Sequence, residues 1–504
     1  MPPQIGETFP DKKAFMFAMK GIAVEEGYQF RCPYSDKSRV AIENKRDYKP
    51  KHLKADVHTD HKVQVNYYVA WRAKNIVLDK VNGTDIESFQ NTFIGTYAPG
   101  FGSRLRKKAD GNLEFYTPNV FDDVTLPFFW FSNDKSSRPL IADMKLAMTN
   151  TVTVEIQGIQ DFSRVFAPMA EKGSRDFIDK DRPMTSIYIT RYEDYTAMLF
   201  AASHMLCDAS GLKLLFDGWQ KVLNGGTVMP LTDELVLPEV KEIGSAFLPA
   251  IQLNLVKKLS MLANFTWSRI KYGKGTVRRI VLSKDLLENL RAKVQSVANF
   301  PISRYDVVWA ISVRLCAIGY GTASFDMLTG SAVDMRHRVG NNDYYMHNFF
   351  VPLSTRVSTH QVLEWSFAEL VIRLKSFLRQ FTEQPDELVK VFNLLESAKP
   401  NPCWLVPYDI NMMVTHWGSF NFTHIDFNAA ATGGETNSKL GKVVAFEPLM
   451  EEKTVSDAVV VVYHDGPNGH GGVVLNHAMH ERNWARAKAA LGNLEAYIES
   501  LIDE

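Results

Sequence analysis

One segment of the sequence combines residue types and a spacing that suit proton transfer. It reads Ser203-His204-Met205-Leu206-Cys207-Asp208-Ala209-Ser210-Gly211, an HxxxDxxG pattern. A buried imidazole at the end of a strand can act as a general base when its ring is held in one orientation. Asp208, in the tight turn that follows, can pair with a cation, and Gly211 lets the next helix begin close to other backbone. The catalytic interpretation expects a buried His204 as the base, with Asp208 and Gly211 shaping its turn.

The motif alone leaves catalysis and coincidence equally open. The chain contains 13 histidines, and about one HxxxD is expected by chance in a sequence of this length. A second copy, His52-Leu53-Lys54-Ala55-Asp56, lies in a charged stretch and has Thr59 where the glycine would stand. The surrounding sequence must therefore decide between the two interpretations.

The elements that would position the motif follow from periodicity and turn residues. A strand over Tyr195 to Ala202 leads into His204, and the apolar positions after Gly211 predict a helix that ends at Gly225-Gly226. Asp110-Gly111 predicts a two-residue hairpin connection. Further strands are expected over 65–71, 76–81, 276–282, 458–464 and 473–476, and further helices after Ser283, over 304–318, over 361–381 and from Arg482 onward.

Composition excludes several classes of protein. The 504 residues carry 57 Lys and Arg against 57 Asp and Glu, and this zero net charge argues against a nucleic-acid partner. No apolar run is long enough to span a bilayer, and the N-terminus lacks the layout of a signal peptide. The four cysteines are far apart and the clustered histidines lack ligand partners, so we expect no metal site. A cytoplasmic monomer without membrane contact is the expectation.

Other segments follow one another in an order that resembles the BAHD-type acyltransferases, which are relatives of chloramphenicol acetyltransferase and of peptide-synthetase condensation domains. The segments are Thr92 to Tyr116, Ser303 to Ala310, Asp334-Met335-Arg336-His337-Arg338 (like DxRxR), Tyr344 to Phe350 (like YxGN), Val414-Thr415-His416-Trp417 (like TSW), and Asp426-Phe427-Asn428-Ala429-Ala430 in the place of DFGWG. The resemblance covers nearly the whole chain, and the sequence looks most like divergent fungal members.

This resemblance implies an α/β fold. The fold would consist of two chloramphenicol-acetyltransferase-like halves, each with a mixed sheet and covering helices, around a central through-channel with His204 midway along it. Residues 1–230 would form the N-terminal half with the HxxxDxxG motif, 231–265 the crossover connection, and 266–504 the C-terminal half with the DxRxR, THW and DFGWG-like segments.

The resemblance also assigns roles to residues. Arg336 would pair with Asp208, and Asn348, Thr415 or Trp417 would stand near the oxyanion of the tetrahedral intermediate. Asp426 is the motif-equivalent residue of the degenerate DFGWG-like segment, whose altered residues put the wall of the coenzyme channel in doubt. Met346-His347 replaces the Phe-Gly of the family and would alter the lining of the channel.

The implied activity is transfer of an acyl group from a coenzyme A thioester to a hydroxyl or amine of a small, secondary-metabolite acceptor. Acyl-CoA would be a co-substrate, with no bound cofactor, and its phosphates would be drawn by some of Lys257, Lys258, Lys271, Lys274, Arg278 and Arg279. Two alternatives stay open. One is a condensation or cyclisation domain fed by a carrier-protein thioester, which the lack of a carrier domain disfavours. The other is a non-catalytic ligand-binding relative.

Overall fold

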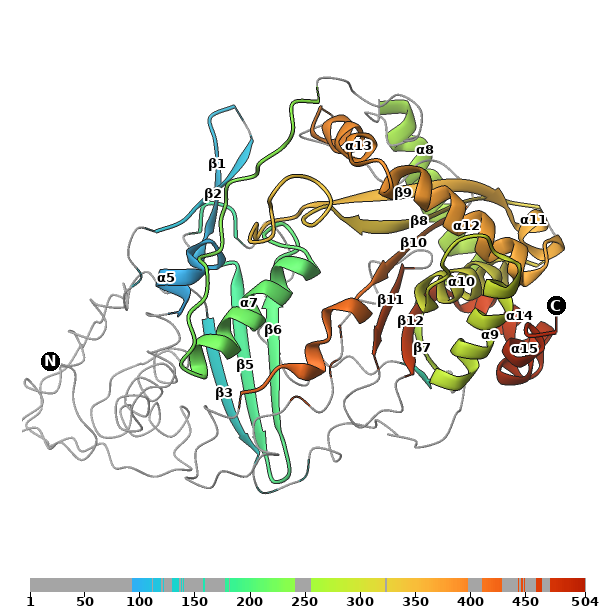
Figure 1. Cartoon of the computed structure of the whole chain (residues 1–504), viewed down its shortest axis with the longest axis horizontal. Coiled ribbons are helices and arrows are strands. Elements are labelled where there is room, and N and C mark those ends of the chain that lie inside the picture. Colours follow the sequence, from blue (N-terminus) through green and yellow to red (C-terminus); the bar gives the residue numbers. More distant parts are fainter. Residues whose placement is uncertain are drawn as a thin grey trace, which may run out of the picture.

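A computed structural model describes part of the chain in two neighbouring bodies of mixed α/β structure (Figure 1). The described ranges are 93–110, 112–118, 129–135, 157–158, 177–180, 182–240, 255–321, 324–397, 410–427, 459–464 and 472–503, with a few single residues between them. The expected strands over 65–71 and 76–81 and the second HxxxD copy lie outside these ranges.

The larger body is built on a seven-stranded mixed sheet with the order β4-β7-β12-β11-β10-β8-β9. Strand β10 runs parallel to both β8 and β11, and the other neighbours are antiparallel. The strands are β4 (Gln157–Gly158), β7 (Gly275–Leu282), β8 (Asp326–Asp334), β9 (Phe350–Ser358), β10 (Ile410–His416), β11 (Val459–His464) and β12 (Val473–His480).

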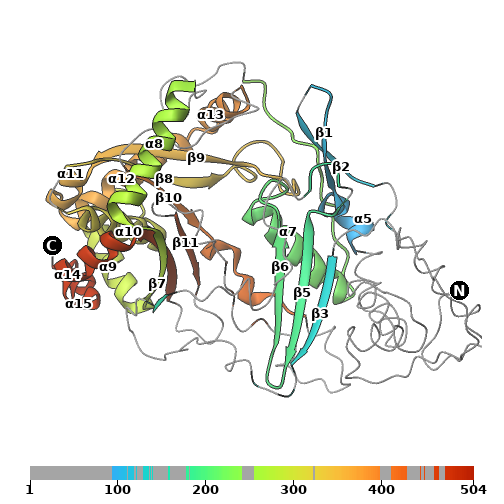
Figure 2. The same ribbon diagram turned by 180° about the vertical axis from the view of Figure 1, so that it is seen from behind.

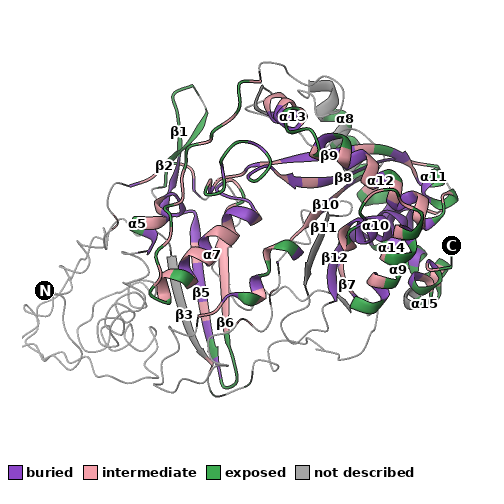
Figure 3. Cartoon of the chain, viewed as in Figure 1, coloured by how far each residue is buried: buried purple, intermediate pink, exposed green. Residues whose placement is uncertain are grey.

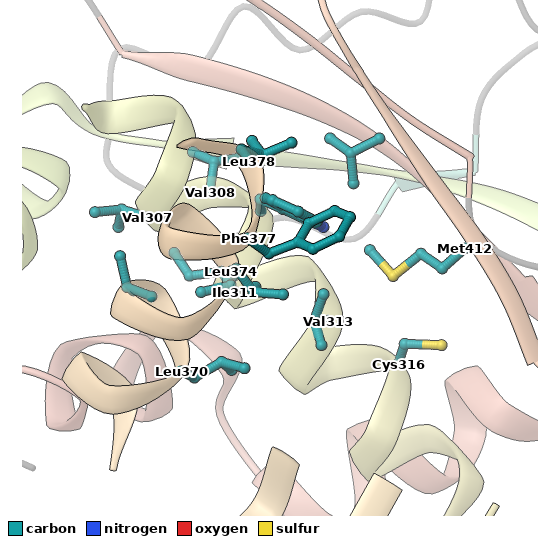
Figure 4. Packing of buried hydrophobic residues seen from close by; sticks show 14 of the residues in the cluster. Val307, Val308, Ile311, Val313, Cys316, Leu370, Leu374, Phe377, Leu378 and Met412 are labelled. Carbon is teal, nitrogen blue, oxygen red and sulfur yellow. The ribbon is translucent and has the colours of Figure 1, made fainter. Parts of the chain in front are cut away.

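Helix α10 is the centre of this body. It begins at a capping box formed by Ser303 and Asp306, and its side chains are buried almost all round (Figure 3). Leucine and phenylalanine side chains of α12 pack on Val307, Val308 and Ile311 of α10 (Figure 4). The helices of this body are α8 (Leu255–Tyr272), α9 (Lys284–Val297), α10 (Arg304–Tyr320), α11 (Thr359–Glu364), α12 (Phe367–Thr382), α13 (Pro385–Ser397), α14 (Glu481–Leu491) and α15 (Leu494–Ser500).

The smaller body contains a three-stranded sheet in the order β3-β5-β6, with α7 beside it (Figure 1). Phe216 of α7 makes an edge contact with Phe200 of β6, with ring centroids 5.4 Å apart, and Leu215 is fully buried in the same cluster. The elements are α5 (Gly95–Tyr97), η2 (Pro99–Gly102), β1 (Arg104–Lys107), β2 (Leu113–Tyr116), β3 (Phe129–Lys135), β5 (Thr185–Tyr192), β6 (Thr196–Ala202) and α7 (Ala209–Leu223).

Segments from late in the sequence reach back to this smaller body. The short helices η5 (Gly418–Phe420) and η6 (Phe422–His424) follow β10 and lie beside α7, where Phe422 packs on Phe216. The loop between β8 and β9 also extends towards the start of α7 in both views (Figures 1 and 2). The two bodies therefore meet around α7.

Most of the expected elements are confirmed, and the exceptions have local causes. The helix expected over 361–381 is wrong as one element, because Ser366 caps a new helix, α12, after α11 ends at Glu364. The C-terminal helix is likewise interrupted, at Gly492, whose φ is +64°. The β1–β2 hairpin is confirmed, but Lys107 pairs with Leu113, so its connection is longer than two residues.

One described helix overlaps the expected connection between the halves. Helix α8 begins at Leu255 and runs past residue 265, where the sequence had suggested a boundary, and it lies at the surface of the larger body (Figure 2). Among the described residues, no helix has both the length and the apolar character needed to cross a bilayer.

Candidate active site

The turn at residues 203–208, which we call the HxxxD turn, connects the end of β6 to the start of α7. Contrary to the expectation of burial, the His204 side chain is exposed. The strand that precedes it lies at the edge of its sheet and is only half-buried, whereas Leu206 and Cys207, later in the turn, are buried. The ring centroids of His204 and Phe350 lie 6.2 Å apart, and no hydrogen bond to the His204 imidazole is found within the described ranges.

Asp208, by contrast, is buried, and both of its carboxylate oxygens accept hydrogen bonds. Its backbone forms the N-cap of α7, and Oδ1 accepts a hydrogen bond from the Gly211 amide at 2.8 Å. Its Oδ2 accepts from the amide of Phe349 at 2.9 Å. Both oxygens also face Arg336, at 2.9 and 3.1 Å, in a bidentate pair. The predicted pairing of Asp208 with Arg336 is therefore present in the structure.

Arg336 is 1% exposed, and each of its five guanidinium N–H groups has an acceptor. Besides Asp208, these acceptors are the carbonyls of Tyr345 and His347 and the carboxylate of Asp334. Burial by itself lowers the pKa of Arg336, but the charges of Asp208 and Asp334 outweigh it and hold that pKa above its ordinary value. A buried charge is tolerated only when it is paired in this way.

A further hydrogen bond connects the start of α7 to the end of β8. Asp334, the last residue of β8, accepts from the Ser210 hydroxyl at 2.6 Å and from Arg336 at 2.9 Å. Ser210, Asp208, Arg336 and Asp334 thus form one network that links the first turn of α7 to the end of β8. The sequence had marked Asp334 only as part of the DxRxR motif, and it had given Ser210 no role.

Gly211 is required by a close approach of backbone. A Cβ atom at this position would lie 2.1 Å from the carbonyl oxygen of Met346, far inside any van der Waals contact. The first turn of α7 therefore rests directly on the chain between β8 and β9. This is the role that the HxxxDxxG spacing predicted for the glycine.

Two neighbouring side chains from that same loop hold the HxxxD turn. The amide nitrogen of Asn348 donates to the carbonyls of His204 and Met205, at 2.8 and 3.1 Å. The Nδ1 atom of His347 lies 2.8 Å from the carbonyl of Leu206. Three successive carbonyl groups of the turn are thus bound by the segment from the larger body.

The three side chains predicted near the oxyanion differ in whether their hydrogen-bond donors are already engaged. Both amide hydrogens of Asn348 are used on the HxxxD turn. The indole N–H of Trp417 donates to the Thr415 hydroxyl at 3.2 Å. Thr415 accepts that bond and keeps its own O–H available. Thr415 is therefore the one of the three whose donor is not consumed by these contacts.

The segment in place of DFGWG lies at the other end of α7. The backbone amide of Asp426 donates to Gln220 Oε1 at 2.6 Å, and Phe427 packs on Trp219 with ring centroids 4.9 Å apart. Helix α7 begins at Ala209, and eleven residues of helix span about 16 Å. Asp426 therefore lies far from the HxxxD turn and against the end of α7, while 428–430 lie outside the described residues.

Cys207 is buried within the HxxxD turn. Burial, and next the charge of Asp208, raises the pKa of its thiol well above the ordinary range, so it is no nucleophile. Across the described ranges, no group of three or more His, Cys, Asp or Glu side chains is arranged to hold a metal ion.

The cationic residues suggested for the CoA phosphates are only partly described. Lys271 and Lys274 are exposed at the end of α8, and Lys274 forms an ion pair with Glu481 at 3.5 Å. Arg278 and Arg279 lie on β7, between β4 and β12. The side chains of Lys257 and Lys258 lie outside the described residues. The choice among them stays a prediction.

Comparison with known proteins finds that the sequence is similar to fungal acetyltransferases. No family model matches the sequence. The chain is 25% identical over 373 residues to acetyltransferase adrJ of Penicillium roqueforti, covering 67% of this chain and 74% of the relative. It is 23% identical to acetyltransferase BOT5 of Botryotinia fuckeliana, covering 67% of this chain and 68% of the relative.

Solved structures agree at the level of the fold. TRI101 of F. graminearum, complexed with coenzyme A and T-2 mycotoxin, superposes with a TM-score of 0.55 at 14% identity, covering 80% of this chain and 88% of that one. TRI101 of F. sporotrichioides gives 0.53 at 12% identity over 81% and 91%. The predicted resemblance to divergent fungal BAHD-type acyltransferases is confirmed, and so is the mixed α/β fold.

Proposed function

We propose that this protein transfers an acyl group from a coenzyme A thioester to a hydroxyl group, or an amine, of a small secondary-metabolite acceptor. The observation that carries the proposal is the HxxxD turn itself, in which an exposed His204 stands on backbone fixed by the buried Asp208–Arg336 pair. The similarity to fungal acetyltransferases supports the reaction class, and the TRI101 structures with coenzyme A are of proteins with this fold.

In the proposed reaction His204 is the general base. Its imidazole takes the proton of the acceptor O–H as that oxygen forms a bond to the thioester carbonyl carbon. The carbonyl oxygen becomes an oxyanion, for which the proposed donor is the Thr415 hydroxyl, which donates no hydrogen bond among the described residues. The C–S bond then breaks, and the imidazolium returns the proton to the departing thiolate, so no acyl-enzyme is formed.

Several further features belong to the proposal. The protein would act as a cytoplasmic monomer, with residues 1–230 and 266–504 as its halves, 231–265 as the connection and a channel through the molecule between them. The zero net charge and widely spaced cysteines support a reduced compartment without a nucleic-acid partner. Light scattering on a sizing column tests the monomer, since a dimer has twice the mass.

The test is turnover with free acetyl-CoA and a panel of alcohols and amines, followed by thiol release and product mass. His204→Ala should lower kcat by about 10²- to 10⁴-fold. His360→Ala is the matched control, because His360 is exposed on α11 in the other body and pairs with Glu364 of the same helix. Near-normal kcat in His204→Ala would overturn the mechanism. Activity only from an acylated carrier protein, with no CoA binding by calorimetry, would favour the condensation-domain alternative.

A further inference from the structure

His347 lies where three separate segments of the chain meet. Its side chain is 12% exposed. The ring stacks on Phe115 of β2, with centroids 5.0 Å apart and planes 3° from parallel. Its Nε2 atom lies 3.3 Å from Asp233 Oδ1 in the connection between the halves, and its Nδ1 atom lies 2.8 Å from the carbonyl oxygen of Leu206 in the HxxxD turn.

The contact with Leu206 has a defined direction. A carbonyl oxygen only accepts, so Nδ1 must carry the hydrogen and donate it. The Phe115 ring stacks on one face of the imidazole and restrains it from another side, which keeps the N–H aimed at the turn. Such a restrained ring loses little further freedom when it forms this hydrogen bond.

This hydrogen bond completes the support of the turn that carries His204. Asn348 binds the carbonyls of His204 and Met205, and His347 binds the next one, of Leu206. Within the described residues, the other hydrogen bonds of this side of the turn run from Leu206 N to the Ser203 carbonyl at 2.9 Å, from Ser203 N to the Met184 carbonyl at 3.1 Å and from Met205 N to Ser203 Oγ at 3.3 Å, and none of these three binds the Leu206 carbonyl. Release of the Leu206 carbonyl would therefore let the backbone two residues after the proposed base move.

The geometry points to His347 as a positioning residue that holds the HxxxD turn, and with it His204, in place for the reaction. The inference rests on the proposed function for its effect on turnover. It assigns His347 no contact with substrate. A shift of about 1 Å in a reacting group can cost about 10²-fold in rate, so a modest loosening of the turn should be measurable.

Three substitutions separate the hydrogen bond to Leu206 from the other contacts. The amide nitrogen of Asn stands about where Nδ1 stands in His, and that of Gln about where Nε2 stands. His347→Ala and His347→Gln should each lower kcat by about 10- to 10²-fold with the KM for acetyl-CoA unchanged. His347→Asn should restore kcat to within about threefold of the wild type, because it keeps the donor towards Leu206.

Hydrogen exchange of the peptide spanning 203–211 gives a readout that does not need turnover. Exchange should be faster in His347→Ala and His347→Gln than in the wild type, and His347→Asn should restore protection. Equal kcat and equal exchange for the Asn and Gln variants would overturn the inference, as would a change confined to KM. If the wild type transfers no acyl group, the proposed function fails, and the exchange of the three variants still decides whether His347 holds the turn.

Discussion

Removal of either partner of the Asp208–Arg336 pair should strongly destabilise the folded protein. Arg336 is 1% exposed and Asp208 9%, so neither charge can be rehydrated when the other is lost. Breaking one side of a buried pair costs about 3–5 kcal/mol. Asp208→Ala also removes the N-cap acceptor of α7, which is worth about 1 kcal/mol more. We therefore expect Asp208→Ala to lower the free energy of unfolding slightly more than Arg336→Met.

Asp208→Asn separates these two contributions. The amide oxygen of Asn still accepts from the Gly211 amide, so the cap is kept while the charge is lost. Its cost should be smaller than that of Asp208→Ala by about 1 kcal/mol. This milder variant also remains measurable if the alanine variant does not fold.

The assay is urea unfolding of the single and double variants, which gives a double-mutant cycle. Asp208→Ala combined with Arg336→Met should cost at least about 2 kcal/mol less than the sum of the single changes, because both deeply buried charges are then absent and Asp334, which also loses its partner, is 32% exposed. The matched control is the exposed pair Lys108–Glu114 across the β1–β2 hairpin, 3.1 Å apart and 49% and 45% exposed, whose coupling should stay below about 1 kcal/mol. Additive losses for Asp208 and Arg336, or a coupling no larger than that of the control, would refute the reasoning.

The other predictions concern packing, burial and the oxyanion. Gly211→Ala should lower stability and kcat because its Cβ would lie 2.1 Å from the Met346 carbonyl oxygen. Gly218→Ala in the same helix should be milder, because its Cβ would meet the ring of Phe93 at 3.1 Å. Equal melting temperatures of the two variants would contradict this. Burial lowers the pKa of His477 from 6.5 to about 4. The unfolded chain therefore binds a proton at this histidine before the folded protein does, so the free energy of unfolding is unaffected by it above about pH 6.5 and falls by up to about 3 kcal/mol as the pH drops towards 4. Urea unfolding at pH 7 and pH 5 should show a weaker pH dependence in His477→Gln than in the wild type. Thr415→Val should lower kcat by about 10²-fold while Thr415→Ser retains most of it, and equal rates would remove Thr415 from the oxyanion role.

The elements around the site could be predicted because their signals are local. The strand that leads into His204 shows β-type composition, and α7 shows apolar positions at helical spacing. Ser283 and Ser303 mark the starts of α9 and α10 through side chains that bond backbone three residues later. The interruption between α11 and α12 was missed because apolar residues flank Ser366 on both sides, while Ser366 itself caps a new helix.

The pairing within the site could not be derived from spacing. The partner of Asp208 is Arg336, 128 residues further along the chain, and no periodicity connects two such positions. The family resemblance supplied that pair. It supplied neither Ser210 nor the hydrogen bond from His347, because serine and histidine at these positions are common residues whose role depends on which carbonyl or carboxylate the fold brings near.

The two HxxxD copies share the same local pattern, so the geometry found at His204 depends on contacts that the pattern does not contain. Both His52 and His204 have an aspartate four residues later, so the local pattern is the same. At His204 the motif continues to Gly211, where the loop between β8 and β9 lies in contact with the helix. Its aspartate, Asp208, pairs with Arg336, whose five guanidinium N–H groups all have acceptors. Each of these contacts comes from the larger body. The orientation of the proposed base therefore depends on the contacts between the two bodies. Substitutions on either side of those contacts should impair that orientation even where they lie far from His204 in sequence.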